Sequence, residues 1–301
     1  MKEAGMPVQS EWSLSAPQQL TFEGPVTALA VRTLGGTVNV VGTDSGPAAL
    51  QLSEIDGPPL VVTHRDGVLT VAYEDLQWKK LLDWSPGRRA RKRTATVTLT
   101  VPTATRVEVG TVTADAVVSG VAGRTEIRSA TGDATLVGLT GEVRAEVVAG
   151  RLEAQRLGGD LRAGSVSGDI TLVESASAVV KADTVTGDVV VDLSPEAAAK
   201  RLDLALSSVA GEVAVRLPGT ADVEVRANTT GGTVSCAFDE LLVSGQFGAR
   251  KVGGALGAGG GRLKVTTVTG AIALLRRPDA ADPSAGTAGA PTDVPAQGKV
   301  L

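Results

Sequence analysis

A nine-residue pattern of apolar and polar positions repeats along residues 114–191. Eight full rows run from 114 to 186, with one extra residue at Ser177, and a ninth row opens at Gly187. Position 1 is Gly in six of the eight rows, position 2 is charged in seven, and positions 3, 5 and 8 are apolar in all but two of their twenty-four places. Alternating apolar residues between glycine-marked turns predict one short β-strand per row. We expect the glycines at position 1 to supply the positive φ of a tight turn.

A single row of this kind cannot bury its own apolar side, so the rows are expected to stack. If two rows form one coil of about 18 residues, each residue lies about 4.8 Å above the residue of the preceding coil. Val143 would then lie between Thr125 and Leu161. Leu136 would lie between Val118 and Ala154. A meander of antiparallel hairpins predicts the same alternation and is the alternative, but the even row length favours a β-solenoid.

Four segments carry a common motif, V-[ST]-G-[DE]-[VI], or a close variant of it. They are SATGDATL at 129–136, GSVSGDITL at 164–172, DTVTGDVVVDL at 183–193 and TTVTGAIALL at 266–275. Over about residues 26–277 the chain resembles the Toastrack-type family of repeated β-strand proteins, which are described as candidate adhesins. The resemblance implies an all-β, right-handed β-solenoid or β-helix-like stack without an established enzymatic activity. It also implies a link to envelope-stress systems and membrane anchors, although this chain shows no anchor of its own.

We expect three parts along the chain, with two strand units of about nine residues per coil in the repeat. Residues 1–102 are expected to form a β-rich N-terminal part and cap, residues 103–277 the repeat solenoid, and residues 278–301 a disordered tail rich in proline and poor in large apolar residues. Ser194 and Pro195 predict the start of a short helical insertion in the stack. The row RLKVTTVTGAIALL at 262–275 is expected to close the fold.

Residues 75–93 break the strand pattern. Their apolar residues predict a short helix, which Pro86 and Gly87 would end before a basic loop. Tryptophan beside clustered basic residues suits peripheral contact with an anionic membrane, and nucleic acid is the weaker alternative. The structural interpretation is a helix that caps one end of the solenoid, followed by a solvated loop. The candidate contact residues are Trp78, Trp84, Arg88, Arg89, Arg91, Lys92 and Arg93.

Composition sets the expected location. The formal net charge is −4, which gives no overall attraction to nucleic acid. The first residues lack the apolar core of a signal peptide, and no run of about 20 apolar residues predicts a spanning helix. We therefore expect a cytoplasmic protein, membrane-peripheral if the basic segment binds lipid. The one cysteine, Cys236, excludes an internal disulfide and is expected to be a buried spacer in the core.

The sequence predicts no catalytic, cofactor-binding or metal-binding residues. The chain has one histidine, and no motif sets a nucleophile beside a base. The Gly-Asp turns resemble those of calcium rolls, but one carboxylate per coil does not offer the six or more oxygen ligands of calcium. We expect these aspartates to bond to the backbone of their own turn.

The functional hypothesis is a non-catalytic β-repeat scaffold that engages a protein partner in a stress or regulatory assembly. The alternative is a polysaccharide-binding or adhesin-like β-helix. Aromatic residues are only 2% of the chain, which disfavours sugar binding because sugar sites use exposed aromatic faces. The sequence leaves the identity of the partner and the oligomeric state open.

Overall fold

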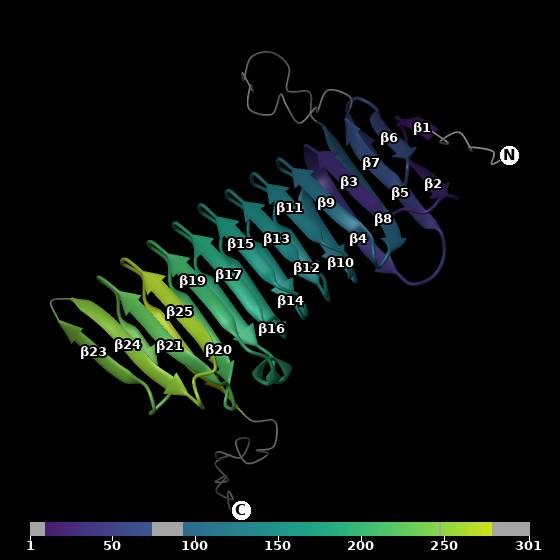
Figure 1. Cartoon of the computed structure of the whole chain (residues 1–301). Helices are drawn as coiled ribbons and strands as arrows, with labels where there is room; N and C mark the ends of the chain where they lie inside the picture. The colour runs from purple at the N-terminus through teal and green to yellow at the C-terminus, as the bar shows by residue number, and fades with distance from the viewer. Residues whose placement is uncertain (1–9, 74–92, 247, 279–301) are drawn as a thin grey trace, which may run out of the picture.

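The computed structural model describes residues 10–73, 93–246 and 248–278. In this part of the chain, two β-sheets face each other along a long, narrow stack, with the N-terminal strands at one end (Figure 1). Sheet A has 14 described strands and sheet B has 12. The central strands pair in parallel, which confirms the predicted all-β solenoid and excludes the hairpin meander. The predicted helix at 75–93 and the predicted tail lie almost wholly outside the described residues.

Sheet A contains, in the order of its hydrogen-bonded neighbours, β1 (Ser10–Leu14), β6 (Leu60–Arg65), β7 (Val68–Tyr73), β3 (Ala28–Thr33), β9 (Arg106–Thr111), β11 (Thr125–Ser129), β13 (Val143–Val147), β15 (Leu161–Ser165), β17 (Val179–Thr184), β19 (Asp203–Ser208), β25 (Gly261–Thr267), β21 (Val223–Thr229), β24 (Ala249–Leu256) and β23 (Leu242–Gln246). Sheet B contains, in the same sense, β2 (Gln18–Phe22), β5 (Ala48–Asp56), β8 (Thr94–Pro102), β4 (Gly35–Thr43), β10 (Asp115–Ser119), β12 (Ala134–Val137), β14 (Leu152–Gln155), β16 (Ile170–Ser175), β18 (Val189–Leu193), β20 (Val213–Pro218), β26 (Ile272–Arg277) and β22 (Val234–Cys236).

Each central coil contributes one strand to each sheet, and the predicted stacking register is confirmed. Val143 pairs with Thr125 on one side and Leu161 on the other. Leu136 pairs with Val118 and Ala154. Pairing 18 residues apart therefore holds over these coils. The extra residue Ser177 lies between β16 and β17 and lengthens the spacing to 19 residues, as in the pairs Leu161–Val180 and Ile170–Val189.

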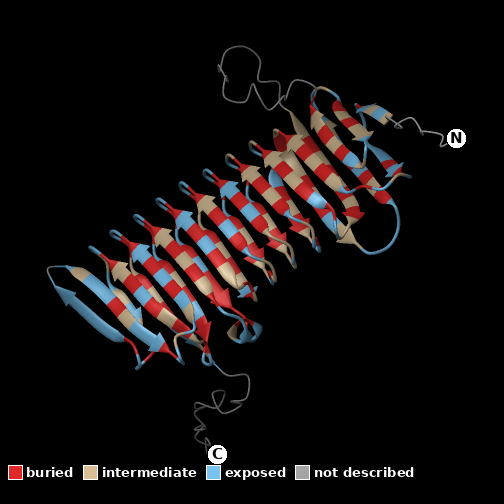
Figure 2. Ribbon diagram, viewed as in Figure 1, coloured by how far each residue is buried: buried red, intermediate tan, exposed pale blue. Residues whose placement is uncertain are grey.

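The apolar residues at positions 3 and 5 fill the space between the sheets. Leu136, Leu152 and Leu161 are all buried, and burial alternates along the strands (Figure 2). Position 8 behaves differently in alternate rows: Leu139 is buried, whereas Val166 is exposed. Position 8 therefore belongs to the core in one set of rows and to the surface in the other.

The backbone at position 7 explains this difference between the two corners. After the strands of sheet B, position 7 adopts a positive φ at Gly120, Gly138, Arg156 and Glu174. The residue at position 8 that follows is buried. After the strands of sheet A, position 7 is instead a buried Ser, Thr or Val without a positive φ, and position 8 remains outside. One nine-residue pattern thus encodes two different corners.

The glycines at position 1 serve close packing and not a positive φ, so the conformational prediction for them is wrong. None of the position 1 glycines has a positive φ. A Cβ atom on Gly168 would lie 1.8 Å from the carbonyl oxygen of Gly150 in the adjacent coil. On Gly150 it would lie 2.1 Å from the carbonyl oxygen of Gly132. Glycine is needed because neighbouring coils approach too closely at this corner for any side chain.

The aspartates of the Gly-Asp turns link neighbouring coils, which corrects the expectation that they bond to their own turn. The Oδ1 atom of Asp115 accepts a hydrogen bond from the backbone N–H of Asp133 at 3.0 Å. In the same way Asp133 accepts from Arg151 at 2.7 Å, and Asp169 from Asp188 at 3.0 Å. Each carboxylate therefore stabilises the stacking of coils directly.

The order of the coils departs from the sequence at both ends. The strands β25 and β26 lie between the β19–β20 coil and the β21–β22 coil (Figure 1). The row at 262–275 therefore does not close the fold, as its place in the sequence predicts. At the other end, β3 and β4 lie between the β7–β8 coil and the β9–β10 coil. Antiparallel strands such as β1 and β24 complete the two ends.

Two local predictions have different outcomes. Ser194 is the N-cap residue of the 3₁₀ helix η2 (Pro195–Ala199), which confirms the helical insertion, but its side chain makes no capping hydrogen bond. Cys236 is a free, half-buried thiol and not a fully buried spacer. The reason is that β22 is the last strand of sheet B, with a pairing partner on one side only.

Candidate functional site

The predicted anionic-surface contact lies largely outside the described residues. Trp78, Trp84, Arg88, Arg89, Arg91 and Lys92 are not described, so this contact remains a prediction. Arg93 is described and lies immediately before β8. Its carbonyl oxygen accepts a hydrogen bond from the N–H of Gly35 at 3.0 Å, and its guanidinium carbon lies 5.9 Å from the ring centroid of Tyr73. Burial raises the pKa of Tyr73, and the charge of Arg93 opposes this shift.

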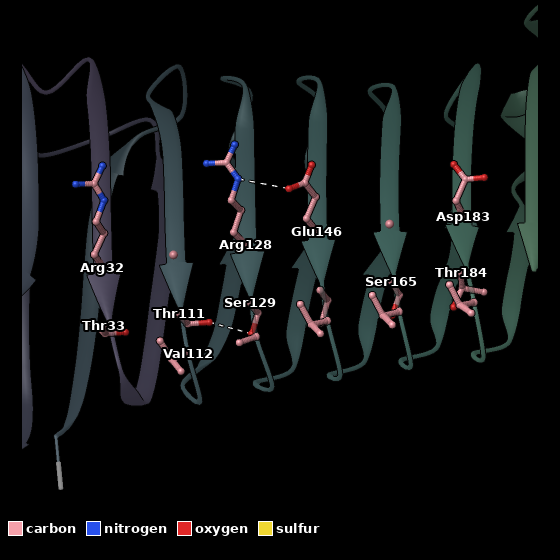
Figure 3. A pocket seen from close by; sticks show the side chains of 17 residues that line it. Arg32, Thr33, Thr111, Val112, Arg128, Ser129, Glu146, Ser165, Asp183 and Thr184 are labelled. Carbon is pink, nitrogen blue, oxygen red and sulfur yellow. Dashed lines mark hydrogen bonds and ion pairs between the residues drawn. The ribbon is translucent and has the colours of Figure 1, made fainter. Parts of the chain in front are cut away.

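A groove of about 570 Å³ crosses sheet A where six neighbouring strands, β3 to β17, end (Figure 3). Three lines of residues form the groove and run across the strands, with at most one residue from each coil in each line. The outer wall comes from position 6 and consists of Arg32, Gly110, Arg128, Glu146, Gly164 and Asp183. The floor comes from position 7 and consists of Thr33, Thr111, Ser129, Val147, Ser165 and Thr184. The inner wall comes from position 8 and consists of Val112, Ala130, Val148, Val166 and Val185.

Most hydroxyl groups of the floor are already used within the fold, with the exception of Thr33, whose buried Oγ1 has no hydrogen-bond partner. Thr111 Oγ1 donates a hydrogen bond to Ser129 Oγ at 3.0 Å, and Ser129 Oγ donates to the carbonyl oxygen of Gly132 at 2.8 Å. Ser165 Oγ accepts from the N–H of Gly168 at 2.8 Å. These hydroxyls satisfy the backbone of the tight corner, so their role is structural.

The inner wall continues beyond the groove as a line of exposed valines, which we call the valine ridge. Its members are Val148, Val166, Val185, Val209 and Val268, and their exposed fractions lie between 44 and 52%. They follow β13, β15, β17, β19 and β25, which are consecutive neighbours in sheet A. At about 4.8 Å per strand, the ridge is about 19 Å long. A continuous exposed apolar stripe is typical of an interaction surface.

The charged groups of the outer wall have partners within the fold. Arg128 forms ion pairs with Glu126 and with Glu146, the latter at 3.5 Å (Figure 3). Arg144 also donates to Glu146, at 2.6 Å, and this hydrogen bond lowers the pKa of the Glu146 carboxyl. Asp183 accepts a hydrogen bond from Ser207. The outer wall is therefore a polar border of balanced charge beside an apolar ridge.

Two of the six residues on the outer wall are glycines, which leave the groove open at their positions. Gly110 and Gly164 both occupy position 6, and a Cβ atom on Gly164 would meet no atom within 4 Å. This site was not predicted from the sequence, because position 8 is apolar in both kinds of row and the apolar pattern does not distinguish them. The available signal was position 7, which is Ser or Thr beside most exposed valines but Gly, Arg or Glu in the rows where position 8 is buried.

The described residues offer little for catalysis or metal binding. In the described ranges, no group of three or more His, Cys, Asp or Glu side chains is placed to hold a metal ion. The single histidine, His64, lies 3.3 Å from the carbonyl oxygen of Pro25 through Nε2, and its ring packs edge-on against Phe22. Nor does any helix in these ranges have the length and apolar character needed to cross a bilayer.

Comparison with known proteins finds a matching family model and similar solved structures. Three solved structures resemble this chain, each over 90% of its length. They are a candidate cell adhesion protein from Clostridium sporogenes ATCC 15579 (13% identity, TM-score 0.29, 100% of that chain), a candidate adhesin from Bacteroides fragilis NCTC 9343 (11%, 0.41, 98%) and a candidate lipid-binding protein from Parabacteroides distasonis ATCC 8503 (9%, 0.37, 98%). No curated protein matches the chain. Residues 93–204 match the family model described as Toastrack DUF4097, so this part of the chain is similar to the Toastrack family.

Proposed function

We propose that this protein is a non-catalytic β-repeat scaffold that binds a protein partner along the valine ridge and its groove. The observation that carries this proposal is the row of five neighbouring valines, each about half exposed, on the turns of one edge of sheet A. The cost of exposing this apolar surface is recovered when a partner covers it.

The backbone of the ridge favours binding through side chains. The N–H of Val148 donates to Ser129 O at 3.0 Å, and the N–H of Ala149 donates to Ala130 O at 2.9 Å. The carbonyl oxygen of Val148 in turn accepts from Ser167 at 2.9 Å. Because these groups already bond the adjacent coils, the ridge offers a partner apolar contact more than backbone pairing.

The outer wall supplies the polar border that protein interfaces commonly have around an apolar centre. Glu146 and Arg128 lie beside the ridge and are partly exposed, so a partner can contact them without removing their charges from water completely. The corner is also held rigidly by hydrogen bonds between coils, and a preformed surface lowers the entropy cost of binding.

A regulatory or envelope-stress assembly is the proposed setting, and it rests on the resemblance to the Toastrack family alone. For the polysaccharide-binding alternative, an exposed aromatic platform would be expected. Among the described residues, Phe22, Tyr73 and Phe238 are buried and Trp12 is half-buried. The described surface therefore favours a protein partner over a sugar.

The test is affinity capture from the native cell with three forms of the full chain. One is the wild type, and the second is a ridge variant with Val148→Ser, Val166→Ser and Val185→Ser. The third is a control variant with Val41→Ser, Val68→Ser and Val190→Ser, since these valines are 39 to 40% exposed but lie elsewhere on the sheets. Proteins retained by the wild type are identified, purified and titrated against each form.

A partner that uses the ridge should bind the ridge variant much more weakly. Full burial of a valine contributes about 1.5 kcal/mol, so burial of the exposed half contributes about 0.8 kcal/mol and three residues about 2.4 kcal/mol. This corresponds to an increase in Kd of about fiftyfold. The control variant should bind the partner with a Kd within about twofold of the wild type, because its substituted valines lie outside the interface and lose no buried area. Equal binding by the wild type and the ridge variant would contradict the proposal.

A further inference from the structure

The described stack has four sheet edges, and one of them differs from the others. Sheet A ends in β1 and β23, and sheet B ends in β2 and β22. An edge strand presents unpaired N–H and C=O groups, and proteins commonly protect such strands with charge, proline or short length. In β1 the protecting residue is the exposed Glu11, while β2 follows Pro17 directly. The strand β22 has only three residues.

The strand β23 has none of these protections. Its five residues, LVSGQ, include no charge and no proline, and all five are exposed. Leu242 is 77% exposed and Val243 is 49% exposed. The strand pairs with β24 on one side, and it forms the outermost strand at the C-terminal end of the described stack (Figures 1 and 2).

We propose that β23 pairs in antiparallel fashion with β23 of a second copy of this chain, across a two-fold axis at Ser244. In this register Ser244 lies opposite Ser244, and Val243 lies opposite Gly245 of the second copy. Each large β-branched side chain therefore faces a residue without a side chain, and no like charges oppose each other. The segment is complementary to itself, which is what a two-fold symmetric interface requires.

The charges around β23 also fit a second copy. Asp239 and Glu240 precede the strand, whereas Arg250 and Lys251 of β24 pair with its last half, at Gly245 and Ser244. Antiparallel pairing places the acidic start of β23 of one copy at the same end of the interface as the basic residues of β24 of the other, two strands away, while Glu240 also forms an ion pair with Arg276 of its own chain. These charges act on association only at long range and are screened by salt, because the Debye length is about 8 Å.

The interface is small, and its place in the fold separates it from the valine ridge. Five strand residues per copy bury less than a standard interface of about 1,600 Å², so we expect a dimer that dissociates on dilution. The ridge lies along the turns that follow β13 to β25 and stays open in this dimer. Dimerisation and partner binding at the ridge can therefore fail independently.

The first test is sedimentation equilibrium of the full chain over a wide range of concentrations. The wild type should move from a mass of 30.4 kDa toward twice that value as concentration rises. Val243→Lys places charges on the shared edge and should keep the protein monomeric at all concentrations. The matched control, Val41→Lys on β4, should dimerise like the wild type, because Val41 is similarly exposed but lies far from β23. Circular dichroism verifies that both variants are folded.

Cross-linking then tests the register. In a Cys236→Ser background, Ser244→Cys should form a disulfide-linked dimer on mild oxidation, because residues facing each other across paired strands satisfy disulfide geometry. Ser45→Cys, on an exposed turn at the other end, should form no disulfide-linked dimer. A wild type that stays at 30.4 kDa at every concentration would overturn the proposal. So would a Val243→Lys variant that dimerises normally.

Discussion

Replacing Gly168 with alanine should separate two coils of the solenoid. A Cβ atom at this position would lie 1.8 Å from the carbonyl oxygen of Gly150 and 2.8 Å from its carbonyl carbon. Non-bonded atoms of these kinds need about 3.5 Å, so the coils must move apart by more than about 1 Å at this corner. Both atoms belong to the backbone, and no side-chain rotation can relieve the contact.

The movement should break the hydrogen bonds nearest to the corner. These are Ser167 N–H to Val148 O at 2.9 Å, Leu152 N–H to Asp169 O at 2.9 Å, and Ser167 Oγ to Val148 O at 3.3 Å, all of which join neighbouring coils. At about 1 kcal/mol each, their loss lowers the free energy of unfolding by about 3 kcal/mol. That is a large part of the free energy of unfolding of a typical domain, which is about 5 to 15 kcal/mol.

The assay is equilibrium unfolding in urea, followed by far-UV circular dichroism, with Gly164→Ala as the matched control. Gly164 lies in the same coil, but a Cβ atom there meets nothing within 4 Å and its φ is not positive. The control should change the free energy of unfolding by no more than about 1 kcal/mol, and in the stabilising direction. If Gly168→Ala were as stable as Gly164→Ala, the close approach of coils would not be the reason for glycine at position 1.

Two further predictions concern charged groups. Burial raises the pKa of Asp192, but its hydrogen bonds and ion pairs with Arg216 and Arg277 lower it further, so the net shift is downward. The stability from this cluster should be complete above the ordinary aspartate pKa of about 3.9 and be lost as pH falls through the lower pKa of the folded state. Asp192→Asn should therefore lower the free energy of unfolding at neutral pH by about 2 kcal/mol, and should weaken the dependence of that free energy on acid pH in urea titrations. The control Glu224→Gln, in an exposed ion pair, should lower it by less than about 1 kcal/mol. Equal losses in the two variants would show that the cluster adds no stability. If the basic segment binds membranes, wild type should co-sediment with anionic vesicles and a variant with Arg88, Arg89, Arg91, Lys92 and Arg93 made neutral should not; wild type that stays in solution would exclude membrane contact.

The sequence predicted the central coils because one physical requirement repeats in every row. Apolar residues at positions 3 and 5 must be covered, and stacking at a fixed period is the way for rows as short as these to cover them. The pairing of Val143 with Thr125 and Leu161 follows from that period alone. The regular spacing of the turns predicted where each strand begins and ends.

The two corners could not be separated by the apolar pattern. Leu139 and Val166 both occupy position 8, yet one is buried and the other forms part of the ridge. The difference arises from the backbone one residue earlier, where Gly138 has a φ of 63° and Ser165 bonds to the backbone of Gly168. Hydrophobicity alone does not record that choice, so the apolar pattern did not predict the valine ridge as an exposed surface.

The order of coils at the ends was also beyond the sequence. The strands β25 and β21 carry the same alternation of apolar residues, so either can pair with β19. The structure pairs β19 with β25, and β21 pairs with β24 on its other side. Long-range competition between similar strands decides this order, and local propensity does not.

Photo-cross-linking from single positions is the most direct test of the ridge as a binding surface. A photoreactive side chain replaces Val166 on the ridge in one form of the protein, and Val190 on β18 of sheet B in another, and both are irradiated in the native cell. The scaffold account predicts that one discrete protein partner becomes attached through position 166 and not through position 190. Attachment through position 190 alone, or the absence of any adduct through position 166, would contradict it.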